Sequence, residues 1–300
     1  MIENILLVGS GAREHSIAKA IDRSTNLNHI FCLASNMNPG IASLCKEFIV
    51  DDFNNPETVS SYATKNNISM AVIGPENPLQ KGVVDSLWNL GVGVVGPKKD
   101  LAQIETSKTF TRNLLKKHNI PGGPKYKTFK SLDGVKDFLK ELDENYVVKF
   151  DGLAGGKGVK VSGDHLSSHE EALEYCKELI SKSQPFIIEE KFIGQEFSLM
   201  SFCDGKTLKH MPAVQDHKRA YENDEGPNTG GMGTYSDADH SLPFLQKKDI
   251  EKAHEINQAT TNALMKEFGY GYKGILYGGF MATKDGVKLI EYNARFGDPE

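Results

Sequence analysis

The chain has 300 residues, of which 39% are hydrophobic and 25% are charged, and its formal net charge is −5. This composition is typical of a globular protein with a substantial core and excludes a disordered or fibrous chain. There is no basic surplus that would favour nucleic-acid binding, and no apolar run approaches the length of a membrane span. We therefore expect a cytoplasmic protein of about two domains that binds neither nucleic acid nor membrane.

The first hundred residues alternate strands and helices. Continuous apolar runs predict parallel strands buried on both faces, at residues 5–8, 30–34, 48–50, 70–73 and 92–95. Helical patterns lie between them, at residues 13–22, 56–66 and 79–90. The sequence therefore predicts an α/β protein whose N-terminal domain, residues 1–101, is a doubly wound parallel sheet.

After residue 97 this alternation stops. Residues 100–118 are predicted as one long helix, and the Gly- and Pro-rich segment 119–124 as a hinge. A small α+β unit and then a group of longer strands follow. Further strands are predicted at residues 126–129, 146–150, 159–162, 186–190, 196–203, 208–214, 275–282 and 287–292, and further helices at residues 132–142, 168–181 and 247–268.

The first glycine cluster, Gly9-Ser10-Gly11, lies between the first strand and the first helix. Glycines at such a turn let the backbone approach a phosphate, and the helix N-terminus offers free N–H groups. A dinucleotide site is disfavoured, because Glu14 stands where a third glycine is needed and the second strand ends without an acid. A phosphorylated substrate and a purely structural turn both remain open.

The second glycine cluster, residues 152–158, lies between two strands and lacks the spacing of a P-loop. A glycine-rich hairpin can fold over a triphosphate, and lysines in it and before it can offset the negative charge. The alternative is a flexible hairpin tip with surface lysines. The residues concerned are Gly155, Gly156, Gly158, Lys149 and Lys157.

Polar side chains also mark two strand ends and one loop. Residues 187–196 run from apolar to acidic, which suits either an adenosine or a solvated strand end. Glu291, Asn293 and Arg295 alternate and therefore share one face of a strand. Their oxygens suit a hard cation such as Mg²⁺ and their guanidinium an anion, unless the face is simply exposed to solvent. The long polar loop 215–233 ends in a glycine nest and favours substrate binding.

The order of these motifs resembles the ATP-grasp superfamily. More closely, GSGAREH, GPExPL, KxDGLAxGKGV, the DHKR and GPNTGGMG segments and ExNxRFGDPE resemble the phosphoribosylamine–glycine ligase family over the whole chain. The resemblance implies a two-lobed α+β ATP-grasp region over residues 102–300, with residues 124–191 as a small mobile lobe. It also implies that the family's C-terminal domain is absent from this chain.

The resemblance further implies ATP-dependent ligation of glycine to 5-phosphoribosylamine through glycyl phosphate, by a monomer or weak homodimer. It assigns ATP binding to Lys108, Lys149, Gly155, Gly156, Gly158, Glu189, Glu190, Lys191, Phe192 and Glu196. It assigns Mg²⁺ or Mn²⁺ to Glu291 and Asn293, with no acid on the preceding strand to hold a second ion. It assigns catalysis to Lys149, Lys157, Asp216 and Arg295. It assigns substrate binding to Gly9, Gly11, Lys218, Arg219, Asn228, Thr229, Gly230, Gly231 and Met232. The alternatives are another ATP-grasp carboxylate–amine ligase, or an inactive nucleotide-binding fragment if the chain ends at Glu300.

Overall fold

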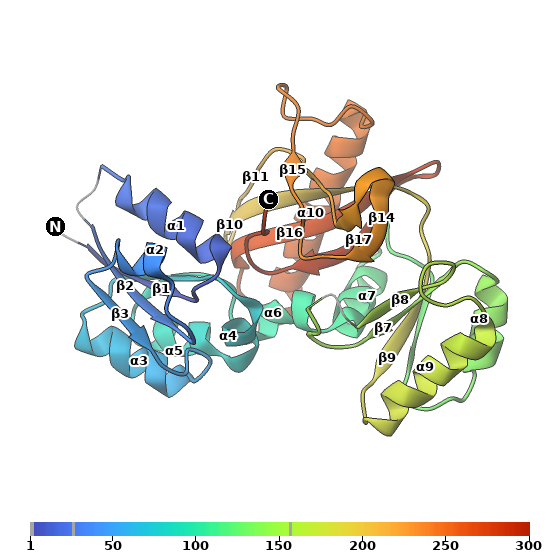
Figure 1. Ribbon diagram of the computed structural model, residues 1–300, viewed down its shortest axis with the longest axis horizontal. Coiled ribbons are helices and arrows are strands. Elements are labelled where there is room, and N and C mark those ends of the chain that lie inside the picture. Colours follow the sequence, from blue (N-terminus) through green and yellow to red (C-terminus); the bar gives the residue numbers. More distant parts are fainter. Residues whose placement is uncertain (1–2, 26–27, 156–157) are drawn as a thin grey trace.

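The computed structural model describes residues 3–25, 28–155 and 158–300. Three larger sheets follow one another along the long axis of the molecule, with the N-terminal unit at one end and a small lobe at the other (Figure 1). No helix within the described ranges is long and apolar enough to cross a membrane.

The N-terminal sheet is parallel and has the order β3-β2-β1-β4-β5. Leu6 and Val8 of β1 belong to one buried cluster with residues of α3 and α5, whereas Leu7 belongs to another with residues of α1 and α2. Helices therefore cover both faces of the sheet, which confirms the doubly wound arrangement. The elements are β1 (Glu3–Val8), α1 (Ala12–Asp22), β2 (Asn28–Ala34), α2 (Pro39–Ala42), β3 (Glu47–Val50), α3 (Pro56–Lys65), β4 (Met70–Ile73), α4 (Glu76–Lys81), α5 (Val83–Asn89) and β5 (Gly93–Val95).

Two helices that the sequence predicts as single elements are each broken in two. The predicted helix at 79–90 is interrupted by Gly82, whose φ of 86° lies in the left-handed region that favours glycine. The predicted helix at 100–118 becomes α6 (Lys99–Thr106) and α7 (Lys108–Lys117). The break falls at Ser107, which is extended and whose Oγ caps α7 by accepting a hydrogen bond from the Phe110 N–H at 3.1 Å.

The small lobe is an antiparallel sheet of order β6-β9-β7-β8 with two helices packed on it. Its buried side chains form a cluster of their own, separate from the main core. The elements are β6 (Tyr126–Phe129), α8 (Val135–Leu142), β7 (Tyr146–Phe150), β8 (Val159–Val161), α9 (His169–Ser181) and β9 (Phe186–Glu190).

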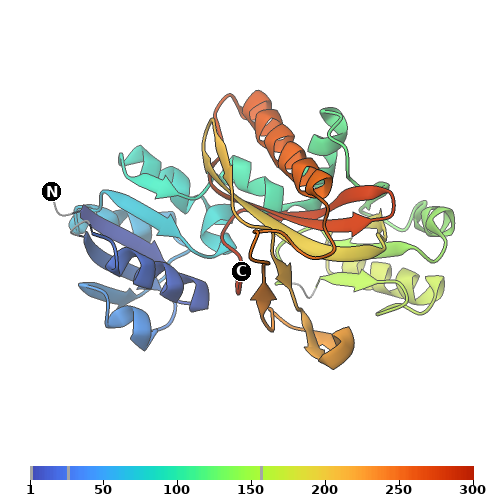
Figure 2. The same cartoon turned by 90° about the horizontal axis from the view of Figure 1, so that it is seen from above.

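The central sheet is antiparallel, has the order β11-β10-β16-β17, and is covered on one face by the long helix α10 (Figure 2). The strand predicted at 208–214 ends at His210, two residues before Pro212, which has no N–H to continue the ladder. Gly274 has a φ of 123°, and a Cβ there would lie 2.9 Å from the backbone of Gly96 after β5. The elements are β10 (Gly194–Asp204), β11 (Leu208–His210), α10 (Lys247–Phe268), β16 (Lys273–Thr283) and β17 (Gly286–Asn293).

The polar loop at 215–233 is more ordered than the sequence suggests. It folds into two nested two-stranded sheets, β12 with β15 and β13 with β14, which project from the central sheet on the side away from α10 (Figure 2). The elements are β12 (Gln215–Asp216), β13 (Arg219–Tyr221), the 3₁₀ turn Glu222–Asp224, β14 (Glu225–Asn228) and β15 (Thr234–Tyr235).

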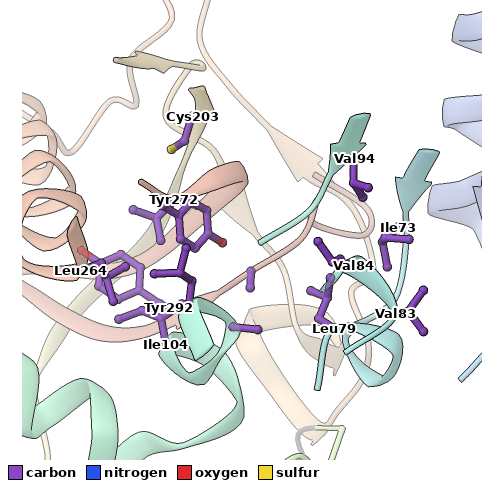
Figure 3. Close-up of a cluster of buried hydrophobic side chains, with 14 of the residues drawn as sticks. Ile73, Leu79, Val83, Val84, Val94, Ile104, Cys203, Leu264, Tyr272 and Tyr292 are labelled. Carbon is purple, nitrogen blue, oxygen red and sulfur yellow. The ribbon is translucent and has the colours of Figure 1, made fainter. Parts of the chain in front are cut away.

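One buried cluster joins the N-terminal unit to the central sheet. Figure 3 shows Leu79 and Val84 of the N-terminal helices on one side and Leu264 of α10 with Tyr292 of β17 on the other, while Ile104 of α6 lies below Tyr292. All five belong to the same hydrophobic core. The N-terminal unit and the central sheet therefore share a core, which the small lobe does not.

Candidate active site

A cavity with a volume of about 140 Å³ lies where α6, α7, the glycine loop and β17 meet. A smaller cavity of about 30 Å³ lies over β10, β12 and β16. Both cavities are lined by Ile290, Glu291 and Asn293 of β17. Polar groups around the larger cavity come from Glu76, Glu105, Lys108, Thr111, Arg112, Glu291, Asn293 and Arg295. The end of β17 therefore stands at the junction of two sites.

The N-terminus of α7 is tied to the start of the glycine loop. The carboxylate of Asp151 accepts hydrogen bonds from Ser107 Oγ at 3.1 Å and from the Thr109 N–H at 3.2 Å. Lys108 Nζ donates to the carbonyl of Gly152 at 3.1 Å and lines the larger cavity. Burial lowers the pKa of Lys108, while Glu291 partly opposes the effect. This cation would therefore gain from an anion in the cavity.

The glycine loop itself lines the larger cavity through Gly155 and Gly158, as the sequence suggests. Gly155 has a φ of 53°, and a Cβ there would meet no atom within 4 Å. Gly156 and Lys157, also predicted to bind ATP or act in catalysis, lie outside the described residues.

A buried ionic network lies beside this cavity. Glu189 of β9 is 2% exposed, and its Oε1 lies 2.7 Å from Arg112 Nε and its Oε2 2.7 Å from Lys149 Nζ. Burial by itself would raise the pKa of Glu189, but Arg112 and then Lys149 lower it to about 2. Lys149 and Glu189 therefore form a buried ion pair. Neither side chain lines either of the two cavities.

Of the three polar residues predicted to share one strand face, Glu291 and Asn293 lie on β17 and line both cavities, whereas Arg295 lies beyond the end of the strand and lines only the larger one. Burial would raise the pKa of Glu291, but the cations Lys149, Lys218, Lys108 and Arg295 together lower it below its ordinary value. The side-chain carboxylate of Glu291 makes no hydrogen bond and no ion pair within 4 Å to any residue in the described ranges. Its carboxylate is ionised and available to a ligand.

Arg295 is held by neighbours from three elements. Its Nη2 donates to Asn293 Oδ1 at 3.0 Å and lies 3.4 Å from Glu105 Oε1 of α6. Its Nε is buried without a hydrogen-bond partner and lies 3.8 Å from Glu76 Oε2 of α4. Burial raises the pKa of Glu105, and Arg295 opposes this. The guanidinium therefore keeps one free donor beside the larger cavity.

The smaller cavity adds three further predicted residues to Glu291 and Asn293. Lys218 Nζ lies 3.5 Å from Glu196 Oε2, and both side chains line the cavity with Asp216. Asp216 Oδ1 is buried without a hydrogen-bond partner in the described part of the chain. Burial, followed by repulsion from Glu300, raises the pKa of Asp216 to about 6. This carboxylate therefore titrates close to neutral pH.

Other predicted residues lie apart from the two cavities. Arg219 Nη2 reaches Asp164 Oδ2 of the small lobe at 3.2 Å, and Lys191 Nζ donates to the Ser162 carbonyl at 2.6 Å. Glu190 is exposed and accepts from the Lys125 N–H. Further predicted residues that do not line either cavity are Phe192, Thr229, Gly230, Gly231 and Met232, while the side chain of Asn228 lies outside the described part of the structure.

The Gly9–Gly11 turn lies at the end of the N-terminal sheet. Its Gly11 N–H donates to the carboxylate of Glu14, which is buried and fills the space beside Gly74. Arg13 Nε donates to the Gly297 carbonyl at 3.3 Å, which links this turn to the segment after β17. The turn borders the site through this contact without lining either cavity.

Three residues that were not predicted as site residues also line the larger cavity, namely Arg112, Glu105 and Glu76. A signal for Arg112 existed. It follows Lys108 by four residues, so the two cations share one face of α7. It also lies on the buried side of the helix beside Leu115, where an unpaired charge is costly. No group of three or more His, Cys, Asp or Glu side chains converges as a metal site within the described ranges.

Two family models match consecutive parts of the chain. The one described as phosphoribosylglycinamide synthetase, N domain, matches residues 3–105, and the one described as phosphoribosylglycinamide synthetase, ATP-grasp (A) domain, matches residues 106–300. The phosphoribosylamine–glycine ligase of Methanosarcina barkeri is 51% identical over 296 residues, covering 99% of this chain and 68% of that protein. The enzyme of the same name from Methanocaldococcus jannaschii is 50% identical over 303 residues, with the same coverage.

Solved structures agree with this relationship. A crystal structure of phosphoribosylamine–glycine ligase from Thermotoga maritima matches with a TM-score of 0.81 at 30% identity, covering 99% of this chain and 70% of that chain. N5-carboxyaminoimidazole synthetase from Staphylococcus aureus, solved in complex with ADP, shares the fold with a TM-score of 0.73 at 15% identity, covering 99% and 71%.

Proposed function

The chain belongs to the phosphoribosylglycinamide synthetase family, and on this premise we propose that it joins glycine to 5-phosphoribosylamine at the expense of ATP. The products are glycinamide ribonucleotide, ADP and phosphate, and the reaction is a step of purine biosynthesis. The structural observation that supports this function is the shared lining of the two cavities. A phosphoryl donor in the larger cavity and an acceptor in the smaller one would meet at Glu291 and Asn293.

The larger cavity suits the phosphates of ATP. Lys108 loses part of its proton affinity on burial, and the network of Arg112, Glu189 and Lys149 holds two cations against one carboxylate. A polyphosphate would stabilise the ammonium form of Lys108 that burial disfavours, and it would offset the net positive charge of the network. The backbone of Gly155 and Gly158 would close over the phosphates, and the strand end formed by Glu189, Glu190, Lys191 and Phe192 would receive the adenine.

Glu291 and Asn293 suit Mg²⁺ or Mn²⁺. Glu291 is ionised and free of protein partners within the described ranges, and the Asn293 Oδ1 that accepts from Arg295 retains a second lone pair. These two oxygens would hold the ion, and phosphate oxygens would complete its shell. When bound, the ion neutralises phosphate charge and so makes the terminal phosphoryl group a better electrophile.

The smaller cavity suits the amino acid and the amine. Lys218 would orient the glycine carboxylate, with Arg295 adding positive charge from the adjoining larger cavity, and Asp216 would accept a hydrogen bond from an amino group. A carboxylate is a poor electrophile until it is phosphorylated, so the reaction passes through glycyl phosphate, which the ribosylamine nitrogen attacks. The protein orients the reactants and excludes water and needs no covalent nucleophile.

Several sequence predictions extend this proposal. The Gly9–Gly11 turn and the loop with Arg219, Asn228, Thr229, Gly230, Gly231 and Met232 would bind the phosphoribosyl part of the substrate. Lys157 would assist phosphoryl transfer, and Glu196 would take the ribose hydroxyls of ATP. The domain boundaries, the cytoplasmic location and the monomeric or weakly dimeric state remain predictions.

The test is ADP release by the purified chain, measured with ATP and Mg²⁺ and with each carboxylate and amine supplied separately. We expect release that requires both glycine and 5-phosphoribosylamine, with glycinamide ribonucleotide detected by mass spectrometry. Release with another carboxylate or with bicarbonate in place of glycine would identify a different ATP-grasp ligase. Binding of ATP without any product would identify a nucleotide-binding fragment.

A further inference from the structure

Arg112 connects two sheets that the chain brings together only in the folded state. Its guanidinium donates two hydrogen bonds to the carboxylate of Glu189 on β9, from Nε to Oε1 at 2.7 Å and from Nη2 to Oε2 at 3.0 Å. It also donates to the carbonyls of Leu289, from Nη1 at 3.4 Å, and of Ile290, from Nη2. One side chain of α7 thus holds both the small lobe and the strand that leads directly into Glu291.

Glu189 passes this restraint on to Lys149. The ammonium of Lys149 lies 2.7 Å from Glu189 Oε2, and all three side chains are nearly inaccessible to solvent. The group carries two positive charges against one negative charge, so its net charge is positive. Lys149 is also the largest positive influence on Glu291 at the cavity. The position of its ammonium group therefore influences the electrostatic potential where a phosphate would bind.

We propose that Arg112 is a positioning residue of the nucleotide site, which fixes the ammonium of Lys149 through Glu189 and fixes β17, with Glu291 and Asn293, through two main-chain carbonyls. The inference rests on the proposed function. Four of the five guanidinium N–H groups of Arg112 already donate to Glu189 or to the carbonyls of Leu289 and Ile290, so its main role is to hold other groups of the site in place.

The geometry explains why this residue is an arginine. A planar guanidinium can serve a carboxylate with two parallel bonds and still reach neighbouring carbonyls, whereas an ammonium offers its donors from a single point. Lysine at this position would keep the charge and lose the paired contact. The proposal therefore predicts that charge alone does not restore the site.

The experiment measures ATP binding by isothermal titration calorimetry in the presence of Mg²⁺ and without glycine or the amine. It compares the wild-type chain with Arg112→Met, Arg112→Lys and Leu114→Ala. Leu114 is a buried core residue on the same helix and has no part in the ionic network, so its truncation controls for simple destabilisation. Thermal unfolding of each variant is recorded in parallel.

We expect Arg112→Met to raise the Kd for ATP by roughly tenfold or more, a loss typical of residues that orient a ligand-binding group. Arg112→Lys should show a smaller but clear loss, and Leu114→Ala should lower Tm while its Kd stays at the wild-type value. In steady-state kinetics the KM for ATP should rise in the two Arg112 variants, whereas the KM for glycine stays constant.

The outcomes separate the inference from the function on which it rests. If the wild-type chain fails to bind ATP, the proposed function is wrong. If the wild type binds and the Arg112 variants bind equally well, Arg112 is only structural and the inference is overturned. If Arg112→Met does not fold, the Kd for ATP of Arg112→Lys is compared with that of Leu114→Ala. Equal affinities overturn the proposal, and a loss of affinity in Arg112→Lys alone supports it.

Discussion

The substitution Glu189→Gln tests the electrostatic centre of the site. It keeps the size of the side chain and removes the charge that Arg112 and Lys149 share at 2.7 Å each. The two cations would then be buried without an anion, which is unfavourable in a medium of low dielectric. We expect a folded but markedly less stable protein.

The magnitude follows from the pKa of the carboxyl group. Burial opposes ionisation of Glu189, yet Arg112 and Lys149 lower its pKa from 4.5 to about 2. At about 1.4 kcal/mol per pKa unit, this difference corresponds to about 3 kcal/mol of folding stability. Removal of one partner from a buried ion pair typically costs about 3–5 kcal/mol, which agrees with this value.

The assay is urea unfolding followed by circular dichroism between pH 7 and pH 3. Because the folded pKa lies below the unfolded one, the stabilisation is complete above pH 4.5 and is lost as the pH falls towards 2. The variant should therefore be about 3 kcal/mol less stable than the wild type at pH 7 and pH 5. Below pH 4.5 the difference should shrink by about 1.4 kcal/mol per pH unit.

Glu190→Gln is the matched control, because Glu190 is the exposed neighbour on the same strand. It should change the free energy of unfolding by less than about 0.5 kcal/mol. If Glu189→Gln lies within that range at pH 7, or if its deficit is the same at pH 7 and pH 3, the reasoning about the buried network is refuted.

Three further substitutions probe other parts of the site. Glu291→Gln should lower kcat about 100-fold or more with Tm nearly unchanged, and a kcat near the wild-type value would contradict the proposed metal ligand. The pKa of Asp216 is raised by burial to about 6, so kcat/KM should fall below pH 6 as the carboxylate becomes protonated, and Asp216→Asn should abolish that acid limb. Gly274→Ala should destabilise the chain by about 3 kcal/mol in thermal unfolding, because its Cβ would lie 2.9 Å from the backbone of Gly96.

The sequence predicted those features that depend on local pattern. The parallel strands of the N-terminal sheet are continuous apolar runs, and Glu291 and Asn293 alternate on one strand face. The two helix breaks were missed because they depend on single residues. A single glycine such as Gly82 is tolerated inside a helix, so the sequence does not reveal its left-handed φ. Ser107 is likewise compatible with a helical position, and only the structure shows that it caps α7.

The ionic network could not be read from the sequence for a different reason. Arg112 meets Glu189 across 77 residues and the carbonyl of Ile290 across 178 residues. Such pairings depend on the packing of three elements, which no local motif records. The apolar-to-acidic run of residues 187–196 left adenosine binding open and the family resemblance placed Glu189 on an adenine-binding strand, but the two cations on its carboxylate appear only in the folded chain.

The separation of the small lobe's core from the main core has a consequence for motion. Near the cavity the lobe meets the rest of the chain through directional polar contacts, such as that of Ser107 with Asp151 and that of Lys108 with the Gly152 carbonyl. When the lobe rotates, such polar contacts can be replaced by others at a lower free-energy cost than the separation of a buried apolar interface. We therefore expect the lobe to tilt as a block, and amide hydrogen exchange should detect it as a cooperative unit that opens independently of the other two sheets.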